Sequence, residues 1–100
     1  MSLTLRDAQH LSWKTFKKFE SMDPSRSAGF DSAAEFVKRA GQIAKRIQML
    51  QGGGSDAQGE LAKLLSELLF SLFVLSERFG VSLEDSFLQT VDELILGFVS

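Results

Sequence analysis

The hydrophobic positions of this chain repeat at helical spacing along most of its length. Apolar side chains recur every three or four residues in four stretches, and this period places them on one face of an α-helix. Residues with branched Cβ atoms, which favour strands, are scarce, and the single proline, Pro24, lies between the first two stretches. The pattern predicts an all-α protein whose four main helices pack as an antiparallel bundle.

Capping residues set the expected ends of these helices. Thr4, with Asp7 three positions later, resembles a capping box at the start of the first helix, and Pro24 ends that helix. Ser32 is placed to cap the second helix, which the glycines of "QGGGSD" end. The third helix is expected from residue 56 or 57 to Phe79, and the fourth opens with the capping box of "SLED". Loops are expected over 23–29 and 52–55.

The third helix is the most informative, because its second half is apolar around nearly its whole circumference. This half reads "LLFSLFVL" and runs from Leu68 to Leu75. A helix that is apolar on every side must be covered on every side, and three partner helices are too few to do so. We therefore expect a homodimer or homotetramer with this half at the interface. The expected interface residues are Leu68, Leu69, Phe70, Leu72 and Phe73. The fourth helix is expected to turn inward Phe87, Leu88, Val91, Leu94, Ile95 and Phe98.

Composition narrows the functional classes. A length of 100 residues fits one domain over 1–100, and a net charge of −2 argues against a general nucleic-acid binder. The absence of cysteine excludes disulfides, thiolate metal sites and a cysteine nucleophile. The first residues form no apolar leader, and no apolar run approaches the roughly 20 residues of a spanning helix. These observations predict a cytoplasmic protein with no membrane partner.

The outer face of the second helix is basic, and two interpretations of its role are open: anion binding, or a solvated face paired with carboxylates. Arginine binds phosphate bidentately, so this face is able to hold an anionic ligand or RNA. Charged helix faces are more often solvated, however, and Glu60, Glu67 and Glu77 of the third helix are available to pair with it. His10 is the only histidine, and no spacing in the sequence assigns it a partner. The basic face consists of Lys38, Arg39, Lys45 and Arg46.

Three phrases of the sequence, in order and spacing, resemble one family. They are "TLRDAQHLSWKTF", "FVKRAGQIAKRI" with Gly41 at its centre, and "LAKLLSELLFSLFVLSERFGVSLEDSF". Together they resemble the MazG-like all-α nucleotide pyrophosphohydrolases over most of the chain. The resemblance implies a tight dimer or tetramer that splits nucleoside triphosphates into the monophosphate and pyrophosphate. It also implies Mg²⁺ held by Glu-x-x-Glu on the second helix and Glu-x-x-Asp on the third.

The chain departs from the family at those acidic positions. The first pair falls on Arg39 and Gln42, and the second falls on Leu64 and Glu67. Arginine carries only donors and leucine carries no ligand atom, so Glu67 alone is a weak metal candidate. We therefore expect no cofactor and no metal-dependent turnover. If the helices are arranged as in the family, Arg39 lies near Glu67, and an ion pair replaces the metal.

The sequence thus supports three functions. The first is a MazG-like binding or assembly module that has lost nucleoside triphosphate pyrophosphohydrolysis. The second is an active nucleotide pyrophosphohydrolase with a rearranged Mg²⁺ site. Its ligands are Glu67 and Glu60, with Glu35 or Glu77 as a further ligand, and Arg39 stabilises the phosphate. The third is binding of an anionic ligand, RNA or nucleotide, through the basic face of the second helix. The candidate remnant site comprises Arg39, Gln42, Glu60 and Glu67.

Overall fold

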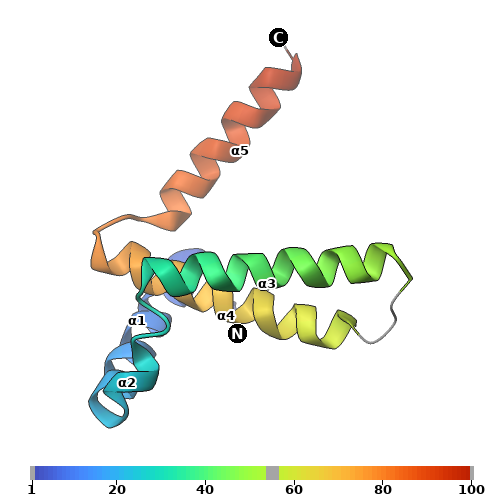
Figure 1. Ribbon diagram of the computed structural model, residues 1–100. Helices are drawn as coiled ribbons and strands as arrows, with labels where there is room; N and C mark the ends of the chain where they lie inside the picture. The colour runs from blue at the N-terminus through green and yellow to red at the C-terminus, as the bar shows by residue number, and fades with distance from the viewer. Residues whose placement is uncertain (1, 54–56, 100) are drawn as a thin grey trace.

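The computed structural model describes residues 2–53 and 57–99, and over these ranges the protein is all-α (Figure 1). Four long helices are present, as the hydrophobic pattern predicts, together with one short helix that it does not predict. No strand occurs within the described ranges. The helices are α1 (Leu5–Met22), α2 (Pro24–Ser27), α3 (Ala33–Gln51), α4 (Ala57–Arg78) and α5 (Leu83–Val99).

Three predicted caps are present. The Thr4 hydroxyl accepts a hydrogen bond from the Asp7 amide at 3.0 Å, and the Asp7 carboxylate accepts one from the Thr4 amide at 3.2 Å. The Ser32 hydroxyl accepts from the Glu35 amide at 3.3 Å, and the Ser82 hydroxyl accepts from the Asp85 amide at 3.5 Å. These bonds satisfy amides that have no partner inside the helix, so the helix starts follow from local sequence.

The short helix α2 corrects the prediction of a loop over 23–29. Pro24 ends α1 and also occupies the first position of α2, where its missing amide hydrogen costs nothing and its fixed φ suits a helix. The Asp23 side chain caps α2 by accepting from the Arg26 amide at 3.3 Å. The other predicted loop, 52–55, lies partly outside the described residues.

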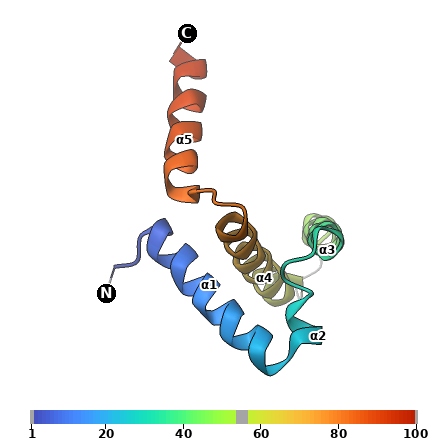
Figure 2. The ribbon, with the colours of Figure 1, turned by 90° about the vertical axis from the view of Figure 1, so that its left-hand side faces the viewer.

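Helix α4 lies between α1 and α3 and contacts both (Figure 2). The Phe30 ring joins these elements, because its centroid lies 6.0 Å from that of Phe19 on α1 and 5.3 Å from that of Phe70 on α4. Three helices therefore build the core of one chain. The buried hydrophobic side chains are Phe16, Ile43, Phe73 and Val74.

The predicted interface set on α4 divides into two parts. Phe73 is buried and Phe70 packs against Phe30, so both belong to the core of the single chain. The sequence instead placed them at a subunit interface, whereas here Phe70 contacts the segment before α3 and Phe73 is covered within its own chain. Leu69 and Leu72 remain 48% and 37% exposed, and Leu68 is half-buried.

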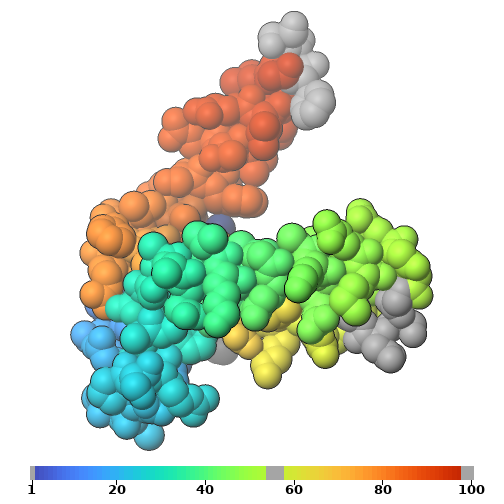
Figure 3. Space-filling model, viewed as in Figure 1, coloured from blue at the N-terminus to red at the C-terminus, as the bar shows by residue number. Residues whose placement is uncertain are grey.

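Helix α5 does not join this core, which corrects the expected inward face of the fourth long helix. It contacts α1 near its start and then points away from the other helices, and the space-filling view shows it standing clear of them (Figures 1 and 3). Val91 is half-buried, and the side chain of Phe98 lies outside the described residues. The other side chains expected to be buried are 54–61% exposed, namely Phe87, Leu88, Leu94 and Ile95.

One buried amide fixes the base of α5. Gln9 on α1 is 6% exposed, and its Nε2 donates to Glu77 Oε2 at 2.9 Å and to the Val81 carbonyl at 2.8 Å. Its Oε1 accepts from the Leu83 amide at 3.2 Å. The polar groups of the turn between α4 and α5 are thus satisfied by a side chain from α1, and we call this arrangement the Gln9 clamp.

Replacing Gln9 by methionine is expected to lower the unfolding free energy by about 1–3 kcal/mol. Methionine has a similar volume but leaves the Val81 carbonyl and the Leu83 amide without their partner. Urea unfolding followed by circular dichroism measures the loss. Gln48→Met on the exposed side of α3 is the control, and equal losses in the two variants would show that the clamp does not stabilise the fold.

Candidate functional site

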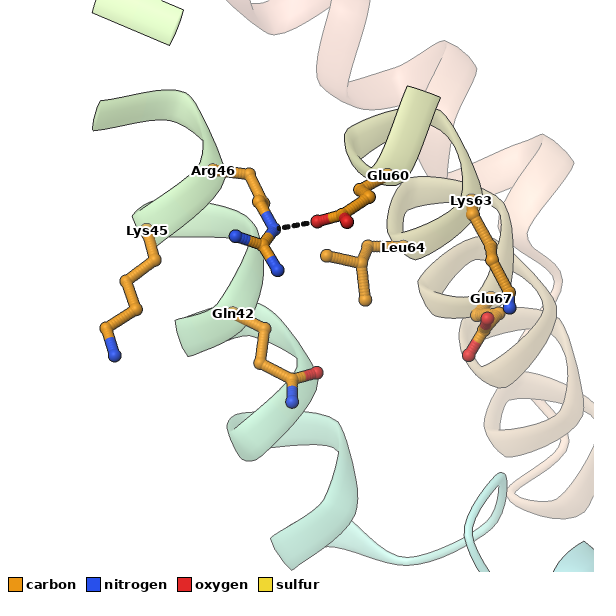
Figure 4. A pocket seen from close by; sticks show the side chains of 7 residues that line it. All are labelled: Gln42, Lys45, Arg46, Glu60, Lys63, Leu64 and Glu67. Atoms are coloured by element: carbon orange, nitrogen blue, oxygen red, sulfur yellow. Dashed lines mark ion pairs between the residues drawn. The ribbon is translucent and has the colours of Figure 1, made fainter. Parts of the chain in front are cut away.

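The groove between α3 and α4 holds three of the four residues of the candidate remnant site. It is an open cavity of about 500 Å³. The fourth residue, Arg39, lies one helical turn further along α3 and is paired with Glu67 of the lining. The fold therefore brings the predicted remnant site together. The groove is lined by Gln42, Lys45, Arg46, Glu60, Lys63, Leu64 and Glu67 (Figure 4).

The antiparallel register of α3 and α4 explains this meeting. Arg39 and Arg46 are seven positions apart on α3, and Glu60 and Glu67 are seven positions apart on α4, so each pair lies on one helix face. Because the helices run in opposite directions, Arg39 meets Glu67 and Arg46 meets Glu60. Two ion pairs therefore span the groove, two turns apart.

The Arg39–Glu67 ion pair is present, as expected from the resemblance. Arg39 Nε lies 3.5 Å from Glu67 Oε2, and the two side chains are 12% and 31% exposed. The Arg39 guanidinium also donates to the Gly29 carbonyl at 3.2 Å and lies 4.8 Å from the centre of the Phe30 ring. A carboxylate, a carbonyl and an aromatic face therefore hold this guanidinium in place.

The Arg46–Glu60 ion pair is shorter but more exposed. Arg46 Nε lies 2.6 Å from Glu60 Oε2, with 35% and 60% of the side chains exposed. Figure 4 shows Leu64 pointing into the groove beside this pair. Water screens such a pair, so we assign it less energy than the Arg39–Glu67 pair.

The basic face of α3 thus divides between paired and unpaired cations. Arg39 and Arg46 face α4, whereas Lys38 and Lys45 are exposed and form no ion pair within the described ranges. Figure 4 shows the Lys45 side chain pointing away from the carboxylates of the groove. The predicted pairing of this face with α4 carboxylates is therefore present for its two arginines.

The third carboxylate expected to face α3 turns to α1 instead. Glu77 Oε1 lies 3.3 Å from His10 Nδ1, and Glu77 Oε2 accepts from Gln9. His10 therefore has a partner that the sequence did not indicate. The two residues are far apart along the chain, and only the packing of α1 on α4 brings them together.

The groove does not fit the Mg²⁺ that the family resemblance implies. Among the described residues that line it, Glu60 and Glu67 are the carboxylates, and each is bound to an arginine. Among the residues that the structure describes, no cluster of three or more histidine, aspartate or glutamate side chains is placed to hold a metal ion. Mg²⁺ requires several oxygen ligands, so we derive no metal-dependent step from this site.

Comparison of the chain with protein-family models, curated proteins and solved structures finds no match. A search of the described residues also finds no helix with the length and hydrophobicity needed to cross a membrane.

Proposed function

We propose that this chain is a MazG-like helical protein that has lost metal-dependent hydrolysis of nucleoside triphosphates and acts as a binding or assembly module. The observation that carries the proposal is the Arg39–Glu67 ion pair. In the MazG-like proteins that the chain resembles, both positions hold metal ligands. Here Glu67 is the carboxylate that remains, and it is paired with the Arg39 guanidinium. The ion pair then links α3 to α4 without metal.

The environment of Arg39 supports this replacement. A guanidinium stays protonated at all relevant pH values, so it cannot become a metal ligand. Its contacts with the Gly29 carbonyl and the Phe30 ring hold its charge beside Glu67. A divalent cation that approached Glu67 would be repelled by this charge at close range.

The other two functions have less support. A rearranged Mg²⁺ site needs Glu60 and Glu67 as free ligands, and both carboxylates are paired. An anion-binding surface on α3 needs free cations, and two of its four cations are engaged. Lys38 and Lys45 alone are long, flexible point charges and provide no bidentate site for phosphate.

We expect no pyrophosphate release from a panel of canonical and modified nucleoside triphosphates, with Mg²⁺ or with Mn²⁺. The physical reason is that both carboxylates among the described lining residues are paired with arginines and do not position a metal and its water. A coupled pyrophosphate assay measures turnover, and added pyrophosphate in the same mixture confirms detection. The Glu67→Gln variant is assayed beside the wild type.

Turnover that is abolished by Glu67→Gln would overturn the proposal and establish a rearranged metal site. Turnover that is equal in both proteins would assign the activity to a different site or to a contaminant. Calorimetric titration with Mn²⁺ provides an independent check, and we expect no heat of binding at millimolar metal.

A further inference from the structure

A single chain exposes more surface than a compact protein of its size. Its accessible surface is 7262 Å². A compact monomer of 11.1 kDa is expected to expose roughly 5,650 Å², so the excess is about 1,600 Å². The radius of gyration of 15.9 Å also exceeds the roughly 13 Å of a compact chain of 100 residues.

Two apolar faces account for this shape. On α5, apolar side chains at helical spacing form one face, and the described contacts of this helix with α1 lie near its start. On α4, exposed leucines (37–48%) and half-buried leucines at helical spacing form a second, partly uncovered face. The α5 stripe consists of Phe87, Leu88, Val91, Leu94 and Ile95. The α4 leucine stripe consists of Leu61, Leu65, Leu68, Leu69 and Leu72.

The turn between α4 and α5 keeps these two faces apart within one chain. Gly80 has a φ of 68°, a left-handed conformation that glycine adopts without strain, and the Val81 amide donates to the Ser76 carbonyl at 2.8 Å. The Gln9 clamp holds the far side of the same turn. Helix α5 is thereby directed away from its own α4 (Figure 1).

We propose that α5 of one copy docks on the α4 leucine stripe of a second copy, whose α5 docks on the α4 stripe of the first. This inference rests on the assembly role proposed above and identifies the partner as a second copy of the chain. A two-fold arrangement provides both contacts at once, because each surface meets its complement on the other copy. Covering the excess surface of two chains removes about 3,200 Å², which is the size of an obligate homodimer interface.

The length and charge of α5 fit this partner. Its 17 residues extend about 25 Å, and the α4 stripe from Leu61 to Leu72 extends about 17 Å, so one helix covers the other. Helix α5 carries four acidic residues and no basic residue, so pairing two α5 helices side by side would bring like charges together. The α4 stripe is uncharged and is flanked by Ala62 and Ser66, so it accepts the acidic helix without such repulsion.

Light scattering after size exclusion, at micromolar concentration, tests the proposal. The wild type is expected to have twice the monomer mass of 11.1 kDa. Leu69→Glu in the α4 stripe and Leu94→Glu in the α5 stripe are each expected to give monomers. Gln89→Glu introduces the same side chain on the opposite face of α5 and is expected to leave the dimer intact. Circular dichroism reports the helix content of every variant.

Mixing the two disrupted variants distinguishes cross-docking from self-pairing. A mixed dimer of Leu69→Glu and Leu94→Glu keeps one undamaged contact, between the α5 of the former and the α4 of the latter. We therefore expect dimers to reappear on mixing, with recovery of helix content if either variant alone had unfolded. Pairing of α4 with α4 and α5 with α5 would leave a glutamate in every contact, so mixing would restore nothing.

A wild-type monomer would overturn the inference and point to a different protein as the occupant. Variants that remain dimeric, or a mixture that remains monomeric, would overturn the docking of α5 on α4. These outcomes test the dimer independently of the proposed loss of catalysis. A dimer that releases pyrophosphate contradicts only the loss of catalysis, and a monomer that releases none contradicts only the dimer.

Discussion

Replacement of Phe16 by alanine is expected to lower the unfolding free energy by about 3–5 kcal/mol. The Phe16 side chain is fully buried where α1 packs on α4, and its ring lies 5.9 Å from that of Trp13. Removing it opens a cavity among side chains that cannot collapse into the space. Small domains have about 5–15 kcal/mol of stability in total, so this one change removes much of it.

Urea unfolding followed by circular dichroism measures this loss. The protein concentration is held constant, because the proposed dimerisation would make the apparent stability depend on it. Phe79→Ala is the matched control, since Phe79 is 75% exposed in the turn after α4 and its loss is expected to change stability by only about 0.5 kcal/mol. Similar losses in the two variants would contradict the assignment of Phe16 to the core.

Replacement of Arg39 by alanine is expected to cost about 2–4 kcal/mol. The substitution removes the ion pair to Glu67, the hydrogen bond to the Gly29 carbonyl and the contact with the Phe30 ring. It also leaves a partly buried carboxylate without its cation. We place the loss below that of a fully buried pair because 31% of the Glu67 side chain is exposed to water.

Arg46→Ala provides the comparison within the same groove. It removes the same type of side chain from the same helix, but its partner Glu60 is 60% exposed, so we expect a loss of about 0–1 kcal/mol. Unfolding at low and high salt separates the two contributions further, because salt screens the exposed pair more than the shielded one. Equal losses for the two arginines would show that Arg39 does not hold α3 on α4.

Local signals in the sequence were sufficient to place the long helices. The Thr4–Asp7 box and the caps at Ser32 and Ser82 depend on residues three positions apart, so they can be read directly from the sequence. The prediction that Pro24 ends α1 is confirmed. The same residue also begins α2, a second role that its position after Asp23 did not reveal.

The direction of α5 could not be predicted from the sequence. Hydrophobic spacing indicates which face of a helix is apolar, but it does not indicate what covers that face. The residue that fixes this direction is Gln9, and its partners Glu77 and Leu83 lie 68 and 74 positions away. A glutamine on a predicted amphipathic helix gives no signal of such contacts before the fold is known.

The candidate site was predicted in part. The charge pattern predicted that the basic face pairs with carboxylates of the third helix, and the family resemblance singled out Arg39 with Glu67 by supplying the register of α3 against α4. Because α3 and α4 are antiparallel, seven positions forward from Arg39 on α3 lies opposite seven positions back from Glu67 on α4. These positions are Arg46 and Glu60, so their pair could have been predicted from the same register. The Gly29 carbonyl beneath Arg39 lies in an irregular segment, and no periodic pattern reports its position.

If α5 docks on a second copy as proposed, its attachment near its start in the described chain couples its own folding to the meeting of two chains. Isolated helices of about 12–15 residues are only marginally stable in water, and α5 with 17 residues is scarcely longer. In a dilute solution its amide hydrogens are therefore expected to exchange with solvent through local opening, while those of α4 exchange through global unfolding. The last helix of this chain is then a segment whose order depends on concentration.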